Sequence, residues 1–315
     1  MAESVLITGG TGFVGSHLAA SLVRDGHEVV TVDERPRTTL LDRLDVAADV
    51  TIERGDVTDF AALARVVEKT DATRLVHLAA PLSSDGTNHI TATQVYTGGP
   101  NNVLEAARVF DEQVDRVVLA SSETVYGPGS EYDLPVSEDA LLDPDTTYSA
   151  GKRYAECLGR TYRQEYGISA VSLRPTGVFG PGANRPIEFA SLFEKPPLGE
   201  TAEVRGGETK VSWLYVKDAA DAFQRATLAT LNSLTHHVYN VRGEVTTVAA
   251  AAERATELFE GGVDVTDESD LDWSAQELSL SRSQSDLGYR VGYDLESTLL
   301  AYGNEIRREA GLDPV

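Results

Sequence analysis

The sequence is poor in cysteine and histidine and has no long apolar run. Its single cysteine, Cys157, excludes an intramolecular disulfide and is expected to behave as a small, partly buried apolar residue. The six histidines do not have the spacing of metal ligands, so no metal site is predicted. No segment approaches the roughly 18 apolar residues that a membrane helix needs. The N-terminus has no signal-peptide pattern, so we predict a cytoplasmic protein without a membrane partner.

Positive charge is also scarce. Lysine and arginine together number 27 against 50 aspartates and glutamates, which gives a net charge of −23. The acidic residues are spread along the whole chain, and such a surface repels nucleic acid and anionic membranes. This composition resembles that of proteins from salt-loving cells, where the Debye length of about 3 Å at 1 M salt weakens the repulsion between carboxylates. We therefore predict a halophilic protein that loses stability at low salt.

Apolar runs typical of strands alternate with amphipathic runs typical of helices up to Pro175. Strands are predicted at residues 5–8, 28–33, 50–56, 74–80, 116–122 and 169–174, and helices at residues 13–25, 60–69, 102–110 and 148–166. The alternation predicts an α/β protein with a Rossmann-type doubly wound parallel sheet. Its ligand site is expected beyond the carboxyl ends of the strands.

The pattern changes after Pro175, where proline and glycine cluster at residues 180–182 and 195–199. Smaller and less regular elements there are suited to a C-terminal substrate-binding lobe. We therefore assign residues 1–175 to a Rossmann domain and residues 176–315 mainly to the lobe. Segments within about 211–245 are expected to return to the Rossmann domain.

A glycine-rich turn joins the first predicted strand to the first predicted helix, with Gly9, Gly12 and Gly15 at its key positions. Glycines let the backbone approach a pyrophosphate, and the N–H groups of the helix N-terminus bind that anion. Asp33 ends the second strand, where an acid can accept hydrogen bonds from the adenine-side ribose and repel the extra phosphate of NADP. Arg35 and Arg37 could instead attract that phosphate. The balance favours NAD.

Further cofactor contacts are predicted at the ends of other strands. Asp56 follows the third strand and could lie near the adenine or serve as a turn acid. The small residues at the end of the fourth strand either let the backbone pass close to the cofactor or simply pack tightly. The predicted cofactor-binding residues are Gly9, Gly12, Phe13, Val14, Gly15, Asp33, Asp56, Val57, Leu78, Ala79, Ala80, Tyr148, Lys152 and Pro175.

Tyr148 and Lys152 stand four residues apart and therefore lie on one face of a helix. A free tyrosine titrates near about 10, and a neighbouring ammonium group lowers that pKa. Such a tyrosine can exchange a proton with a substrate hydroxyl while hydride moves to or from the same carbon. Ser122 ends the fifth predicted strand, where its hydroxyl could orient the substrate oxygen.

With these motifs in this order, the chain resembles the extended short-chain dehydrogenase/reductase family, in its branch of NAD-dependent sugar epimerases and dehydratases. The matching segments are residues 8–15, 55–56, 77–80, 121–127, 148–152, 174–175 and 180–181, and more weakly residues 213–218, 238–241 and 285–289. The resemblance implies that Tyr148 is the acid/base and that Lys152 lowers its pKa and binds ribose. It also implies that Ser122 polarises the substrate oxygen, and that a homodimer forms through the helices at about 100–113 and 148–166.

The departures from the family concern the substrate. Gly177 stands where nucleotide-sugar epimerases usually carry an asparagine, and Val211-Ser212 where they often carry Arg-Asp. Residues 270–274 are acidic where a basic segment is common. A diphosphate needs cationic or N–H partners, so these changes argue against a nucleotide-sugar substrate. The cations that could compensate are Arg174, Arg185, Arg205 and Lys210.

Two internal family positions and the residues after Ser122 also differ. Tyr96 stands where asparagine is usual, and Pro100 where threonine is usual. Glu123 and Thr124 follow Ser122, whereas the related 4,6-dehydratases use an Asp-Glu pair for elimination. Glu123 could be a second acid/base or a solvated loop acid, so dehydration is the least supported reaction. The predicted substrate-binding residues are Glu123, Thr124, Gly177 and Arg185.

We therefore predict an NAD-dependent oxidoreductase of the sugar epimerase type, with Ser122, Tyr148 and Lys152 as catalytic residues. It would transfer hydride reversibly at a secondary alcohol or ketone of a sugar-like substrate. One alternative is an NAD-dependent dehydrogenase of a non-nucleotide sugar or hydroxy acid. An alternative of another class is a non-catalytic NAD-binding sensor or scaffold.

Overall fold

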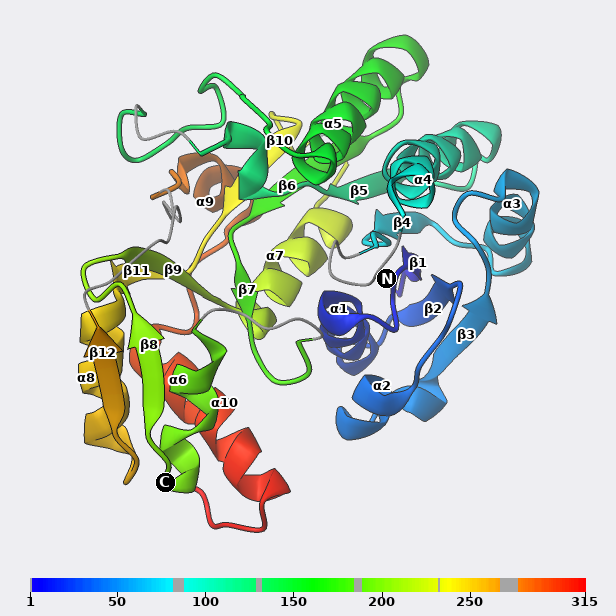
Figure 1. Ribbon diagram of the computed structural model, residues 1–315. Helices are drawn as coiled ribbons and strands as arrows, with labels where there is room; N and C mark the ends of the chain where they lie inside the picture. The colour runs from blue at the N-terminus through cyan, green and yellow to red at the C-terminus, as the bar shows by residue number, and fades with distance from the viewer. Residues whose placement is uncertain (1, 82–87, 129–131, 184–188, 232, 267–276) are drawn as a thin grey trace.

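A seven-stranded sheet forms the centre of the molecule, and all of its strands run parallel (Figure 1). The computed structural model describes residues 2–81, 88–128, 132–183, 189–231, 233–266 and 277–315. The strands are β1 (Ser4–Thr8), β2 (Glu28–Asp33), β3 (Val50–Arg54), β4 (Arg74–His77), β5 (Arg116–Ala120), β6 (Ala170–Pro175) and β10 (Val238–Val241). Their order across the sheet is β10-β6-β5-β4-β1-β2-β3. The strand order reverses between β1 and β4, because β2 and β3 extend the sheet on one side of β1 and β4 begins its other side. Ligands bind at such switch points.

Helices cover both faces of this sheet, as the predicted α/β class requires. One face packs against α1 (Phe13–Arg24), α2 (Thr39–Arg43), α7 (Val216–Leu228) and α9 (Ser281–Leu287). The other face packs against α3 (Phe60–Lys69), α4 (His89–Val109) and α5 (Thr147–Tyr166). Except for the edge strand β3, the strands are buried on both sides, which explains why they are rich in apolar residues. The Rossmann-type fold is confirmed.

The strands end earlier than predicted, and one helix begins earlier. β3, β4 and β5 stop before the polar and small residues that leave the sheet edge. Helix α4 begins at His89, well before the predicted start at residue 102. The side chain of Asn88 caps it by accepting a hydrogen bond from the Thr91 amide at 2.9 Å. Gly98, Gly99 and Pro100 are poor helix formers, so local propensity hid this half of the helix.

The C-terminal lobe contains two small sheets (Figure 1). One joins β7 (Val178–Phe179), β9 (Lys210–Tyr215) and β11 (Glu244–Thr247), and the other joins β8 (Ala202–Arg205) and β12 (Val263–Thr266). They pack with α6 (Ala190–Glu194), α8 (Val248–Leu258) and α10 (Leu295–Glu309). Fully buried Trp213 contacts the rings of Phe179, Phe189 and Phe193 and forms the centre of this second core.

Between the strands of the lobe, the chain returns to the large sheet. Helix α7 packs along α1, and β10 pairs with β6 at the sheet edge. Near the start of α7, the Asp218 carboxylate accepts hydrogen bonds from the amides of Gly292 and Tyr293. Burial raises the pKa of Asp218 to about 6, although these N–H donors act in the opposite direction. This contact ties the segment before α10 to the Rossmann layer.

Candidate functional site

The glycine turn lies tightly packed between the exit of β4 and the start of α1. Gly9 has a φ of +76°, and a Cβ there would lie 2.7 Å from the Ala79 amide nitrogen. A Cβ on Gly15 would lie 2.3 Å from the Gly9 carbonyl oxygen. Side chains at either position would push the turn away from its neighbours. The turn is thus a cradle in which only glycine fits.

The N-terminus of α1 is suited to an anion. Gly12 is its N-cap, no side chain caps it, and its first turn holds no acidic residue. The first backbone N–H groups of such a helix need partners, and they carry positive partial charge. Phe13 and Val14 are partly buried against the core of the C-terminal lobe, so they hold this end of the helix in place.

Asp33 faces this glycine turn from the end of β2. Its carboxylate accepts a hydrogen bond from the Thr11 amide at 3.0 Å. Burial raises the pKa of Asp33, while the hydrogen bonds from Thr11 and Gly10 act in the opposite direction. By contrast, Arg35 and Arg37 are exposed, and the Arg35 guanidinium lies 3.6 Å from Glu34. Arg37 meets the turn only through its backbone amide, which donates to the Thr11 hydroxyl at 3.3 Å, so the Asp33 carboxylate is the charged side chain bonded to the turn.

The predicted adenine-side residues have structural roles. Asp56 accepts hydrogen bonds from the amide and the hydroxyl of Thr58, both at 2.8 Å, and so acts as a turn acid. Val57 is buried under α4, where its carbonyl accepts from Asn102 at 2.9 Å. Contact of either residue with an adenine stays a prediction, and it is compatible with these roles.

The Tyr148 and Lys152 side chains project from the first turns of α5. The Thr146 and Ser149 side chains cap this helix reciprocally. Lys152 is buried, and its ammonium group donates to the Ala120 carbonyl oxygen at 2.7 Å. Burial lowers the pKa of Lys152 to about 8. The same nitrogen lies 5.5 Å from the centroid of the Tyr148 ring, so its charge acts on the phenol.

Ser122 lies two residues beyond Ala120, at the carboxyl end of β5. It caps the short helix η2 (Glu123–Tyr126), which contacts α5. Its hydroxyl oxygen accepts from the Thr124 amide at 3.2 Å and from the Thr124 hydroxyl at 3.1 Å. The structure therefore brings the three predicted catalytic residues to the exit of β5, on the side of the sheet where the glycine turn leaves β1.

The predicted substrate residues join the exits of β5 and β6. Glu123 accepts a hydrogen bond from the Gly177 amide at 2.8 Å, two residues after Pro175 ends β6. Thr124 is exposed beside Ser122. Arg185 lies outside the described residues. Three of the four predicted substrate residues thus lie beside the predicted catalytic residues.

Arg174 cannot supply the missing phosphate contact, so that suggestion was wrong. Its side chain is almost fully buried on β6, and its guanidinium donates to both carboxylate oxygens of Glu156, at 2.7 and 2.8 Å. It also donates to the Tyr126 hydroxyl at 2.8 Å and to the Glu138 carbonyl at 3.2 Å. Arg205 and Lys210 are exposed on β8 and β9 of the lobe.

Two residues of this region were not singled out from the sequence. Glu156 is one helical turn beyond Lys152, and besides Arg174 it accepts from the Ser121 hydroxyl at 2.6 Å. The sequence could have revealed Glu156, because it follows Lys152 by four residues and so lies on the same face of the helix as Tyr148 and Lys152. His77 ends β4 with its Nδ1 2.8 Å from the Thr8 hydroxyl. Burial, helped by the charge of Lys152, lowers the pKa of His77 to about 3, so the ring is neutral.

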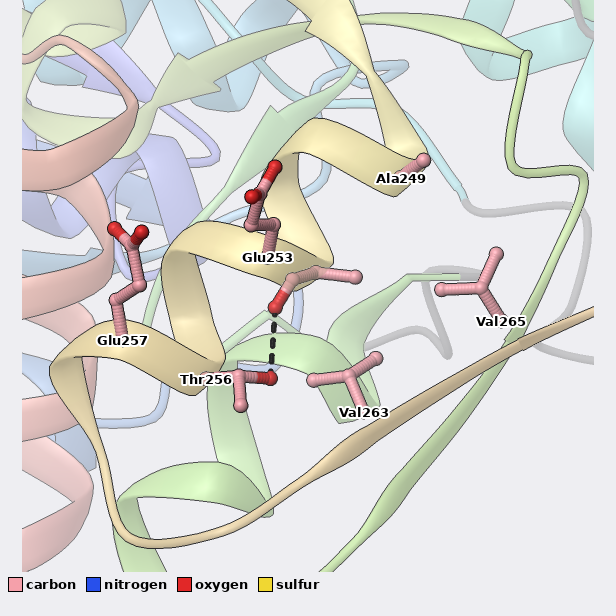
Figure 2. Close-up of a pocket in the computed structure, with 7 residues that line it drawn as sticks. Ala249, Glu253, Thr256, Glu257, Val263 and Val265 are labelled. Atoms are coloured by element: carbon pink, nitrogen blue, oxygen red, sulfur yellow. Dashed lines mark hydrogen bonds between the residues drawn. The ribbon is translucent and has the colours of Figure 1, made fainter.

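A separate cleft of about 370 Å³ lies in the lobe between α8 and β12 (Figure 2). Val263 and Val265 form one wall, and Thr256 donates back to the Ala252 carbonyl of its own helix. None of the predicted site residues lines it. Within the described residues there is no cluster of potential metal ligands and no helix that is both long and apolar enough to cross a membrane.

Comparison with known proteins identifies the family of this chain. Residues 5–242 match the model of the NAD dependent epimerase/dehydratase family. The chain belongs to this family. Membership confirms the predicted resemblance, and the cofactor of this epimerase/dehydratase family is NAD. The cradle that only glycine fits, the uncapped N-terminus of α1 and the placement of Asp33 all suit that dinucleotide.

Individual members of the epimerase/dehydratase family share about a third or less of their aligned residues with this chain. UDP-glucuronate 4-epimerase 3 of Arabidopsis thaliana is 34% identical over 191 residues, covering 56% of this chain and 43% of that protein. UDP-glucuronate 4-epimerase 1 of the same plant is 29% identical over 243 residues, covering 73% of this chain and 55% of that protein. The chain therefore spans about half the length of these curated relatives.

Solved structures match over nearly their full length. UDP-glucose 4-epimerase from Thermotoga maritima superposes with a TM-score of 0.83 at 22% identity, covering 98% of this chain and 99% of that one. L-threonine dehydrogenase from Cupriavidus necator superposes with a TM-score of 0.80 at 25% identity, covering 95% and 98%. One architecture therefore serves both an epimerase of a nucleotide sugar and a dehydrogenase of L-threonine, a hydroxy amino acid.

Proposed function

We propose that the chain catalyses reversible hydride transfer at a secondary alcohol or ketone of a sugar-like substrate, as an epimerase with NAD as its cofactor. The observation that supports this proposal is the buried Lys152, which bonds to the end of β5 and lies beside the Tyr148 ring. Ser122 follows on the same strand exit. A proton-transferring phenol, a cation that tunes it and a hydroxyl that can orient a substrate oxygen together fit alcohol oxidation.

In this proposal, Tyr148 accepts the proton of the substrate hydroxyl during oxidation and returns it during reduction. The Lys152 ammonium stabilises the phenolate, and the Ser122 hydroxyl donates a hydrogen bond to the substrate oxygen. NAD, when bound, supplies the hydride acceptor and donor. An epimerase returns the hydride to the opposite face of the same substrate carbon, whereas a dehydrogenase releases NADH.

A second candidate is an NAD-dependent dehydrogenase whose substrate carries no nucleotide. This candidate is favoured because two groups that could donate hydrogen bonds to a phosphate already donate to carboxylates within the chain. The Gly177 amide donates to Glu123, and the Arg174 guanidinium donates to Glu156. The Glu123 carboxylate at this position would also repel a diphosphate. The similarity to an L-threonine dehydrogenase, whose named substrate carries no nucleotide, agrees with this alternative.

The dinucleotide that stays with the purified chain separates the two candidates. The chain is purified in high salt without added cofactor and denatured, and the released dinucleotide is quantified per chain. We expect close to one NAD per chain, because an epimerase regenerates its cofactor within each turnover. An empty site that binds NAD reversibly and forms NADH with a sugar or hydroxy acid would favour the dehydrogenase. Release of NADP would contradict the role of Asp33.

We also propose that two copies associate through α4 and α5, which lie side by side (Figure 1). These helices expose large apolar side chains to solvent in the single chain: Ile90 is 74% exposed, Val109 49% and Tyr166 51%. Pairing the two helices with those of a second copy would cover them in a four-helix bundle. A sedimentation mass equal to one chain would contradict this homodimer.

The net charge of −23 supports a proposal about solution conditions: the chain works in a cytoplasm of high salt. The melting temperature is expected to rise between dilute buffer and roughly 2–3 M KCl, because salt screens the repulsion between the many carboxylates. Differential scanning calorimetry over a KCl series measures this effect. An equal series in sucrose controls for general exclusion of cosolutes, and a flat KCl series would refute the halophilic assignment.

A further inference from the structure

Helices α4 and α5 are in close contact beside the predicted catalytic pair. Gly151 lies between Tyr148 and Lys152 on α5, and a Cβ built on it would be 2.6 Å from the Cβ and 3.1 Å from the Cγ of Tyr96 on α4. Any side chain at residue 151 would therefore separate the helices or displace Tyr96. The absent side chain at 151 and the large one at 96 are complementary.

Tyr96 is held on two further sides. Its ring meets the Tyr148 ring edge to face, with centroids 5.7 Å apart and planes at 78°. Its hydroxyl donates to the Pro81 carbonyl oxygen at 2.9 Å. Pro81 follows Leu78–Ala80, the backbone against which Gly9 packs. With only 7% of its surface exposed, Tyr96 thus connects the catalytic helix to the strand exit beside the glycine turn.

We propose that Tyr96 is a positioning residue that, seated on Gly151, sets the direction of the Tyr148 side chain. Edge-to-face contact restricts the ring plane of the partly exposed Tyr148, and the bond to Pro81 restricts Tyr96 in turn. The phenol must meet a substrate oxygen at hydrogen-bond distance, so a small reorientation of its ring costs rate without changing the binding surfaces. This inference rests on the proposed function of Tyr148.

Three variants separate positioning from general packing. Tyr96→Leu removes the ring, Gly151→Ala inserts a Cβ beneath it, and Tyr96→Phe keeps the ring but removes the bond to Pro81. The matched control is Gly159→Ala on the same helix, where a Cβ would come closest to the end of the Leu119 side chain, at 3.1 Å. The glycine substitutions make the same change in helix propensity, so a difference between them reports on the contact with Tyr96.

We expect Tyr96→Leu and Gly151→Ala to lower kcat by roughly ten- to a hundredfold, with KM and the NADH dissociation constant within about threefold of the parent. Tyr96→Phe should retain most of kcat, and Gly159→Ala nearly all of it. If Tyr96→Leu does not fold, Gly151→Ala and Tyr96→Phe still test the proposal. An unchanged kcat in folded Gly151→Ala, or equal losses in the two glycine variants, would overturn it.

A second measurement needs no substrate. The absorbance of phenolate near 295 nm is titrated for each chain and for the same chain carrying Tyr148→Phe, and their difference gives the pKa of Tyr148. A shift in Gly151→Ala and Tyr96→Leu, absent in Gly159→Ala, supports the proposal even if the parent transfers no hydride to any substrate. Absence of hydride transfer in the parent would count against the proposed function but not against the positioning role of Tyr96. An identical Tyr148 pKa in all chains would contradict the positioning role.

Discussion

Replacing Tyr148 by phenylalanine is expected to lower the rate of hydride transfer by roughly 10²-fold or more, while NADH binding and the melting temperature stay close to those of the parent. The substitution removes one oxygen from a partly exposed side chain, so the packing against Tyr96 and Lys152 persists. Steady-state kinetics and a fluorescence titration with NADH measure the two effects. A parent that binds NADH but turns over no substrate, with Tyr148→Phe identical to it, would favour a non-catalytic sensor or scaffold.

The partner variant Lys152→Met tests why the phenol works near neutral pH. Without the ammonium group the phenolate loses its stabilisation, so the pKa of Tyr148 rises and the remaining activity moves to higher pH. In the parent, oxidation should weaken above about pH 8, because Lys152, whose pKa burial lowers to about 8, then loses its charge. A pH–rate profile that is identical in the parent and Lys152→Met would contradict this role.

Replacing Arg174 by methionine is expected to lower the free energy of unfolding by about 3–5 kcal/mol, as for other buried pairs that lose one partner. The change leaves the Glu156 carboxylate, whose side chain is 1% exposed, without its bidentate partner. Burial by itself raises the pKa of Glu156, but the hydrogen bonds and charge of Arg174 outweigh it and hold that pKa below its usual value. Urea denaturation at constant high salt measures the loss.

Two further variants make this prediction specific. Lys69→Met removes one side of an exposed pair with Glu53, where Lys69 is 69% exposed, and should cost less than about 1 kcal/mol. Among the described residues, the Glu156 charge in Arg174→Met keeps only the ion pair with Arg153, at 3.2 Å. Adding Glu156→Gln removes this buried charge and should restore part of the stability. A loss in Arg174→Met no larger than in Lys69→Met would show that the buried pair contributes little.

The same pair connects stability to the site. Glu156 accepts from Ser121 at 2.6 Å, and Lys152 donates to Ala120 at 2.7 Å, so two successive residues of the β5 exit are bonded to α5. Ser122 follows directly. Arg174→Met is therefore expected to lower kcat as well as stability, because Arg174 holds the Glu156 carboxylate that bonds to Ser121, the neighbour of Ser122.

Much of the fold and of the site follows from local order in the chain. Strands buried on both faces are apolar runs, and amphipathic helices have a 3.6-residue period, so their alternation predicts the parallel sheet. The glycine turn with Asp33, and the four-residue spacing of Tyr148 and Lys152, need only a strand-turn-helix unit and one helix face. These motifs could be predicted from the sequence because the residues of each motif are close together in the chain.

Contacts between distant segments settled the rest. Arg174 had the charge for a phosphate, but Glu156, 18 residues away in the sequence, takes its guanidinium in the core. The first half of α4 is helical despite Gly98, Gly99 and Pro100. Within this helix Tyr96 packs against Gly151 of α5, and Gly99 packs against His77 at the end of β4. The Gly177 amide is bonded to Glu123 only because β5 and β6 are adjacent in the sheet. The charge of a residue and its helix propensity can be read from the sequence. Its burial and its hydrogen-bond partners depend on which strands and helices the fold makes neighbours.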